Sequence, residues 1–145
     1  MISKEDPLTN LYVEKDKVDR LRLFLALKHF VGIDKSTGEP VFLEEFYEME
    51  KKKKVIVYLL YRRAASALGH IKDHQIGISI RDISNVLNMD YNVVRDEVNK
   101  SESIEKEKEN GRYYIPGDNL ENAIQELEHK SGVYYSTEKN TRKIK

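Results

Sequence analysis

The chain has 145 residues, no cysteine, and 25 basic against 25 acidic residues. That length accommodates one hydrophobic core and is short for two. The lack of cysteine excludes a disulfide framework and a thiolate metal site. Apolar runs such as Val55–Tyr61 are too short to span a bilayer, and the N-terminus lacks the basic start and apolar run of a signal peptide. We therefore expect a cytoplasmic protein with no membrane partner.

The charge is unevenly distributed along this neutral chain. Residues 1–50 carry 7 basic against 11 acidic side chains, whereas residues 51–78 carry 7 against 1, a net charge of +6. Residues 79–116 carry 6 against 8. Because contacts to phosphate supply most non-specific affinity for DNA, the local basic block is compatible with nucleic-acid binding. Frequent Lys and Glu and the missing cysteine are typical of thermophile proteins.

Helical spacing predicts a first helix from Glu14 to about Val31, ended by Gly32. Its apolar residues recur three and four positions apart, as Val18, Leu21, Leu25 and as Phe24, Leu27, Val31. Because this apolar face is wide, we expect the helix to be well buried. The turn-rich residues 34–40 follow, between residues 30–33 and 41–43, and they predict either a short hairpin of those two segments or a plain loop.

A second helical pattern begins near Leu43 or Glu44 and runs to Leu68, where Gly69 stops it. It indicates either one long helix or two helices with a break near Lys51. An acidic residue four positions before a basic one is favourable in a helix, so we expect ion pairs in this region. The expected pairs are Glu48 with Lys52 and Glu50 with Lys54.

Basic residues gather in this second pattern, at Lys51–Lys54 and again at Arg62 and Arg63. No acidic residue separates Lys51 from Lys72, which favours a patch that contacts phosphate. The alternative is a solvated helix face that the preceding glutamates neutralise.

Residues 79–100 have the local signals of two short helices joined by a tight turn. Ser79 is a suitable N-cap for a helix over residues 80–87, and Asn88 tolerates the left-handed turn conformation. Asp90 is a suitable N-cap for a second helix, from Tyr91 to about Lys100. Val94 and Val98 are predicted to face the core.

A hairpin and a final helix are predicted next. Acidic and basic residues alternate over residues 105–108 of the segment 103–108, Asn110–Gly111 is a typical hairpin turn, and residues 112–115 return as the second strand. Asp118 or Asn119 is then expected to cap a helix from Leu120 to about Lys130.

The order helix, tight turn, helix, hairpin in residues 79–115 resembles the winged helix-turn-helix superfamily, and the similarity begins at Lys51 if residues 51–68 are its leading helix. The resemblance implies a mainly α fold with a small β-hairpin wing (α+β), an N-terminal helical extension and a C-terminal helix. The expected parts are the extension at 1–50, the winged-helix domain at 51–131 and a flexible tail at 132–145.

In DNA-binding members of this superfamily the second helix enters the major groove and the wing contacts the backbone. The resemblance therefore implies that Tyr91, Asn92, Arg95 and Asn99 face bases or phosphates. It also implies backbone contacts from Lys106, Lys108 and Arg112, and the basic run adds Lys51, Lys52, Lys53 and Lys54. The sequence departs from the DNA-binding pattern in its carboxylates, namely Asp90, Asp96, Glu97, Glu105, Glu107 and Glu109.

Two functions remain open from the sequence. The first is a small DNA-binding transcriptional regulator that binds double-stranded DNA as a homodimer through its N-terminal helices. The second is a protein-interaction adaptor subunit of a replication, transcription or other assembly. The serines lack a recognisable histidine-acid partner pattern, no Gly-rich phosphate loop occurs, and His70, His74 and Asp73 lack further ligands nearby. We therefore expect neither an enzyme nor a bound cofactor or metal.

Overall fold

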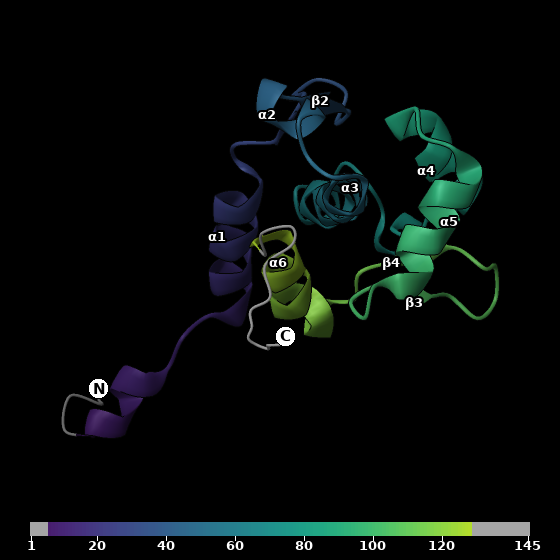
Figure 1. The fold of residues 1–145 in the computed structure, drawn as a ribbon. Helices are drawn as coiled ribbons and strands as arrows, with labels where there is room; N and C mark the ends of the chain where they lie inside the picture. Colours follow the sequence, from purple (N-terminus) through teal and green to yellow (C-terminus); the bar gives the residue numbers. More distant parts are fainter. Residues whose placement is uncertain (1–5, 129–145) are drawn as a thin grey trace, which may run out of the picture.

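The computed structural model describes residues 6–128, so the predictions on residues 129–145 lie outside the described residues. The described chain is mainly helical, with two small antiparallel sheets of two strands each (Figure 1). In chain order its elements are η2 (Pro7–Leu11), α1 (Lys15–Leu27), β1 (Val31–Ile33), β2 (Pro40–Phe42), α2 (Glu44–Tyr47), α3 (Lys51–Ala67), η3 (Asp73–Gln75), α4 (Ile80–Leu87), α5 (Tyr91–Lys100), β3 (Glu105–Lys106), β4 (Tyr113–Tyr114), η4 (Gly117–Asn119) and α6 (Leu120–Glu128).

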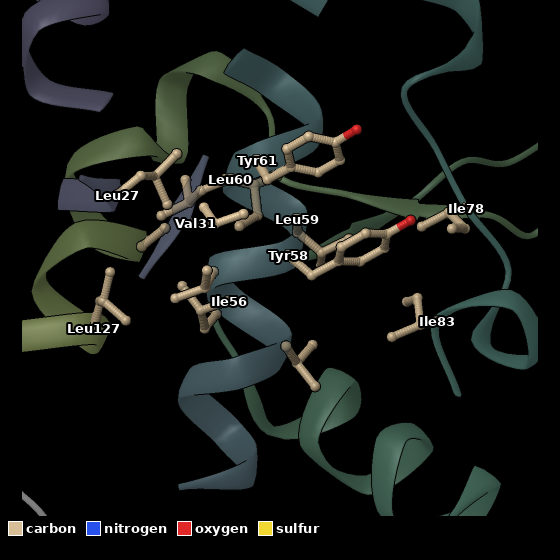
Figure 2. Packing of buried hydrophobic residues seen from close by; sticks show 14 of the residues in the cluster. Leu27, Val31, Ile56, Tyr58, Leu59, Leu60, Tyr61, Ile78, Ile83 and Leu127 are labelled. Carbon is tan, nitrogen blue, oxygen red and sulfur yellow. The ribbon is translucent and has the colours of Figure 1, made fainter. Parts of the chain in front are cut away.

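Helix α3 is the centre of the fold, and the other long helices surround it (Figure 1). All seven residues from Val55 to Tyr61 are buried, as expected for a helix that is apolar on every side. Figure 2 shows its side chains between Leu27 and Leu127 on one side and Ile83 on the other. The N-terminal region, residues 79–115 and α6 therefore share one hydrophobic core.

The hairpin expected as one alternative is present, and its strands β1 and β2 lie close to the two segments, 30–33 and 41–43, that flank the predicted turn. Val31 pairs with Phe42, and the loop closes where Gly38 has a positive φ of 79°. The prediction that the first helix extends to Val31 is wrong, since α1 ends at Leu27. The backbone of Val31–Ile33 pairs instead with β2, a partner that helical spacing alone does not reveal.

The prediction that the first helix is well buried is also wrong. Only Leu23 and Leu27 of α1 are buried. The exposed fractions of four other apolar residues range from 45% to 59%, namely Val18, Leu21, Phe24 and Leu25. Because a helix contacts its own core along one side only, a wide apolar face needs a second partner to be covered.

The break near Lys51 is present, and it rules out the ion pairs expected around it. Helix α2 ends at Tyr47 and Glu50 occupies the N-cap position of α3, so no continuous helix aligns the glutamates with the lysines. Lys52 instead lies 3.8 Å from a carboxylate oxygen of Glu126 in α6. Lys54 Nζ lies 5.7 Å from the ring centroid of Phe46 in α2.

The local predictions for residues 79–100 are confirmed in detail. The side chain of Ser79 accepts a hydrogen bond from the backbone N–H of Asp82 at 3.1 Å. Asn88 has a φ of 54° and ends α4. The side chain of Asp90 caps α5 by accepting from the N–H of Asn92 at 3.0 Å. These caps fix the start of both helices, which positions the residues that follow them.

The second hairpin and the last helix are close to prediction. Glu105 pairs with Tyr114, and Gly111 has a positive φ of 70° in the connecting loop. Helix α6 buries Ala123, Ile124 and Leu127. Helix α6 follows η4 directly, and the side-chain amide of Asn119 donates to the carbonyl of Ser103 at 3.1 Å. No helix within residues 6–128 is long and apolar enough to cross a membrane.

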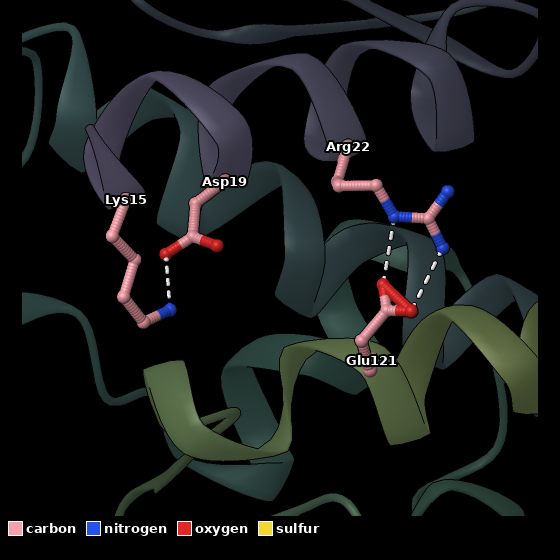
Figure 3. A network of polar contacts seen from close by, with 4 residues as sticks. All are labelled: Lys15, Asp19, Arg22 and Glu121. Carbon is pink, nitrogen blue, oxygen red and sulfur yellow. Dashed lines mark hydrogen bonds and ion pairs between the residues drawn. The ribbon is translucent and has the colours of Figure 1, made fainter. Parts of the chain in front are cut away.

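A salt bridge connects the N-terminal region to the last helix. The Nε and Nη2 atoms of Arg22 in α1 donate to the two carboxylate oxygens of Glu121 in α6, at 2.7 and 2.9 Å (Figure 3). Lys15 pairs with Asp19 within α1 at 2.9 Å in the same view. The Arg22–Glu121 pair adds a polar contact between α1 and α6 to the core packing of Leu23 and Leu27.

Candidate nucleic-acid interface

A cleft of about 380 Å³ opens where the starts of α4 and α5 face the second hairpin. Its lining residues are Ser79, Ile80, Arg81, Tyr91, Lys106, Gly111 and Tyr113. The charged members of this lining are two cations, Arg81 and Lys106, and no carboxylate belongs to it. These seven residues form the basic cleft.

Local structure determines where each side chain of the basic cleft lies. Arg81 is the second residue of α4, two positions after the Ser79 cap, and Tyr91 is the first residue of α5, directly after the Asp90 cap. Lys106 and Tyr113 are partners in the hairpin register. The Nζ atom of Lys106 lies 6.0 Å from the centroid of that tyrosine ring, a cation–π distance.

The structure brings together only some of the residues that the sequence predicted as DNA contacts. Tyr91 and Lys106 line the basic cleft. The remaining predicted residues of α5 and the hairpin are exposed but do not line it, namely Asn92, Arg95, Asn99, Lys108 and Arg112. Sequence reasoning missed Arg81. Its position in the first turn of α4, after the N-cap Ser79, could have indicated that it belongs to the site.

The carboxylates of α5 are partly engaged inside the protein. Asp90 accepts the capping hydrogen bond from the backbone of Asn92. Asp96 accepts from Arg95 Nη2 at 3.3 Å, so this pair places a carboxylate beside a predicted base-contacting guanidinium. A hydrogen bond from a backbone N–H leaves the negative charge of the Asp90 carboxylate in place, and the Asp96 contact reduces the positive charge of Arg95.

Two carboxylates of the hairpin also face protein groups. Glu105 accepts from the side-chain amide of Asn119 at 3.3 Å. The carboxylate of Glu107 lies over the backbone of Gly77, so close that a Cβ at this glycine would be 2.7 Å from the carboxylate carbon. The alternating acidic residues of the hairpin are therefore partly turned away from Lys106, which is consistent with a cation-only lining of the basic cleft.

The basic residues of α3 do not extend the basic cleft. Arg62 donates through Nε to the carbonyl of Ile76 at 2.8 Å and through Nη2 to that of Gln75 at 2.7 Å. Arg63 donates to the carbonyl of Ile115 at 3.1 Å. These arginines hold the loop before α4 and the end of the hairpin, and none of the residues 51–63 lines the basic cleft.

The four lysines of the predicted phosphate patch differ in exposure. Lys51 and Lys52 are exposed, whereas Lys53 and Lys54 are half-buried. Lys52 is directed toward α6 and Lys54 toward α2, as their contacts above establish. The run therefore does not present four free ammonium groups on one surface.

Within residues 6–128, no three His, Cys, Asp or Glu side chains come together in a way that would hold a metal ion. No family model, no curated protein and no solved structure matches the chain.

Proposed function

We propose that residues 79–115 form a winged helix-turn-helix that binds double-stranded DNA, and that the protein is a small transcriptional regulator. The order α4, left-handed turn at Asn88, α5 and β3–β4 hairpin supports the assignment. In this motif the second helix lies in the major groove and the hairpin is the wing. Helix α3 then corresponds to the leading helix of the module.

The observation that supports DNA binding most strongly is the lining of the basic cleft. Arg81 and Lys106 present two cations, and Tyr91 adds a hydroxyl group. These are the side chains that contact phosphate oxygens in protein–DNA interfaces. Because no carboxylate lines the cleft, a phosphate placed there meets attraction without direct repulsion from the lining.

Sequence specificity, in this proposal, comes from the exposed side of α5. Asn92 and Asn99 are suited to adenine and Arg95 to guanine. The Arg95–Asp96 contact competes with a bidentate contact to guanine, since the same guanidinium makes both. We therefore expect phosphate contacts to supply most of the affinity and base contacts to add modest specificity.

Fluorescence anisotropy with a labelled duplex of random sequence at low salt tests the phosphate contacts. Arg81→Ala and Lys106→Ala should each weaken binding and reduce the slope of log K against log salt by about 0.9. Lys17→Ala, which removes an exposed cation from α1, should leave both quantities unchanged. Absent binding at low salt would refute the proposal, as would an equal loss in all three variants.

A second candidate function is a protein-interaction adaptor. The large apolar side chains that α1 and the preceding residues expose favour it, because such surfaces mark protein contacts. Isolation of the full-length protein from its native host distinguishes the two functions. A stoichiometric foreign partner together with absent DNA binding supports the adaptor, whereas DNA binding lost in the Arg81 and Lys106 variants supports the regulator.

A further inference from the structure

Helix α1 has a second apolar face opposite the one that contacts the core. At 3.6 residues per turn, Val18, Leu21 and Leu25 lie on the side of the helix away from the buried Leu23 and Leu27. Their exposed fractions are 46%, 56% and 45%. Nothing within residues 6–128 covers this stripe, and a helix that is apolar on two faces is normally buried on both.

The residues before α1 form an apolar arm with acidic ends. Within residues 6–14 the large apolar side chains are 66–83% exposed, namely Leu8, Leu11, Tyr12 and Val13. No residue of η2 is buried, and Figure 1 shows this segment extending away from the body beyond the start of α1. Asp6 and Glu14 are the charged residues of this segment, so the arm is acidic.

A groove of about 490 Å³ lies at the other end of α1, between its second half, the first hairpin and the end of α3. Besides apolar residues, its lining includes Tyr61 and two cations, Arg20, which pairs with Asp16 at 3.0 Å, and Lys28. Phe24, Leu43 and Leu68 belong to both the groove lining and the exposed apolar surface. The groove therefore continues the uncovered surface of α1, and Lys28 adds a cation to its lining that suits the acidic arm.

We propose that this surface binds a second copy of the chain. In the dimer the two α1 helices are antiparallel across a two-fold axis near Leu21, and residues 8–13 of each copy cover the groove of the other. The proposal goes beyond DNA binding and does not rest on it, because the basic cleft is built from residues 79–113.

The spacing of charges along α1 supports the antiparallel arrangement. Glu14 and Lys28 are each seven residues from Leu21, on opposite sides of it. Two antiparallel copies centred at Leu21 therefore place Glu14 of one copy beside Lys28 of the partner subunit. The same symmetry extends the arm past residue 28 of the partner, toward the groove lined by Val31 and Ile33.

A partner's arm fits the groove better than the chain's own arm does. In its own copy, the arm leaves the first turn of α1 and continues away from the groove (Figure 1). A stable dimer buries about 800 Å² from each copy, which three residues of one helix do not supply. The stripe, the arm and the groove together provide a self-complementary surface, as two-fold symmetry requires.

The mass of the full-length protein in solution is the first test, by light scattering after gel filtration. We expect twice the chain mass of 17.0 kDa. Leu21→Glu should give 17.0 kDa, because two carboxylates would meet at the axis. Val86→Glu, at a position of α4 that is 43% exposed, should keep the doubled mass. Circular dichroism of each variant verifies that the fold is retained.

Cross-linking and charge exchange test the arrangement itself. The chain has no cysteine, so Leu21→Cys introduces one thiol, and oxidation should link two copies. Val86→Cys should give no link. Glu14→Lys and Lys28→Glu should each weaken the dimer several-fold, and the double variant should restore it.

The proposal is overturned if the unmodified protein is monomeric at all concentrations. A stripe covered by residues 129–145 or by a foreign protein would give this result. A dimer that Leu21→Glu leaves intact and Leu21→Cys does not cross-link also overturns it. Neither result bears on DNA binding, which the variants of Arg81 and Lys106 test separately.

Discussion

Residues 79–115 and residues 6–33 use similar amounts of apolar side chain in different ways. In the later region Ile83 and Val94 are fully buried, and the caps at Ser79 and Asp90 satisfy the helix starts. In the earlier region most large apolar side chains are exposed. In residues 79–115 the local signals and the packing agree, and most large apolar side chains are covered within one chain. Residues 6–33 also fold, but they leave apolar surface uncovered.

The largest expected effect comes from the core of the later region. Ile83→Ala should lower the free energy of unfolding by about 2–5 kcal/mol, because the buried side chain leaves a cavity. Val86→Ala on the same helix should change it by less than about 0.5 kcal/mol, because Val86 is largely exposed. Urea unfolding followed by circular dichroism measures both. Equal losses would show that the core is not where the structure places it.

A smaller effect is expected at the turn between α4 and α5. Asn88→Val should destabilise the protein by about 1–2 kcal/mol, because a β-branched residue is strained at a φ of 54°. Asn88→Gly should be close to neutral, because glycine adopts this conformation freely. Thermal unfolding of the two variants provides the comparison, and a valine variant as stable as the glycine variant would contradict the left-handed turn.

The polar attachment of α1 is expected to contribute less. Arg22→Gln should cost about 0.2–1 kcal/mol, because the Arg22–Glu121 pair is largely exposed and solvent screens it. A double-mutant cycle with Glu121→Gln isolates the pair, and its coupling energy should fall as salt is added. A coupling energy that salt does not change would mean that the pair is not electrostatic.

The smallest effect concerns alkaline pH. Burial raises the pKa of the Tyr61 hydroxyl above its ordinary value, and this hydroxyl donates to the carbonyl of Gly38. The contribution of Tyr61 to stability is therefore complete below about pH 10 and is lost as pH rises through the raised pKa. Tyr61→Phe should show a smaller loss of stability above that pH in denaturant titrations. An unchanged pH profile would contradict the burial of this hydroxyl.

Sequence-based prediction succeeded where the interacting residues are close in sequence and failed where they are far apart. The caps of α4 and α5 and the turn at Asn88 depend on residues within four positions, and the structure confirms them. The end of the first helix was placed too late because the helical spacing continues to Val31, whose strand partner, Phe42, is eleven residues away. The burial of α1 was overestimated because a wide apolar face does not say which chain covers it.

The candidate site was only partly predictable for the same reason. Tyr91 and Lys106 followed from the motif, whereas Arg81 belongs to the basic cleft because α4 and the hairpin meet in space. The carboxylate of Glu107 counted against phosphate binding in the sequence, yet it lies over Gly77. The roles of Arg62 and Arg63 were also hidden, because their acceptors are carbonyls of distant loops.

Helix α3 contacts both regions compared above, and no linker separates them. If the chain dimerises through α1 and binds DNA through the basic cleft, a rigid core sets the distance between the two clefts. A symmetric operator would then tolerate little change in half-site separation. Adding about five base pairs, half a helical turn, would place the second half-site on the far side of the duplex. The spacing of the operator would thus be encoded in the packing around α3.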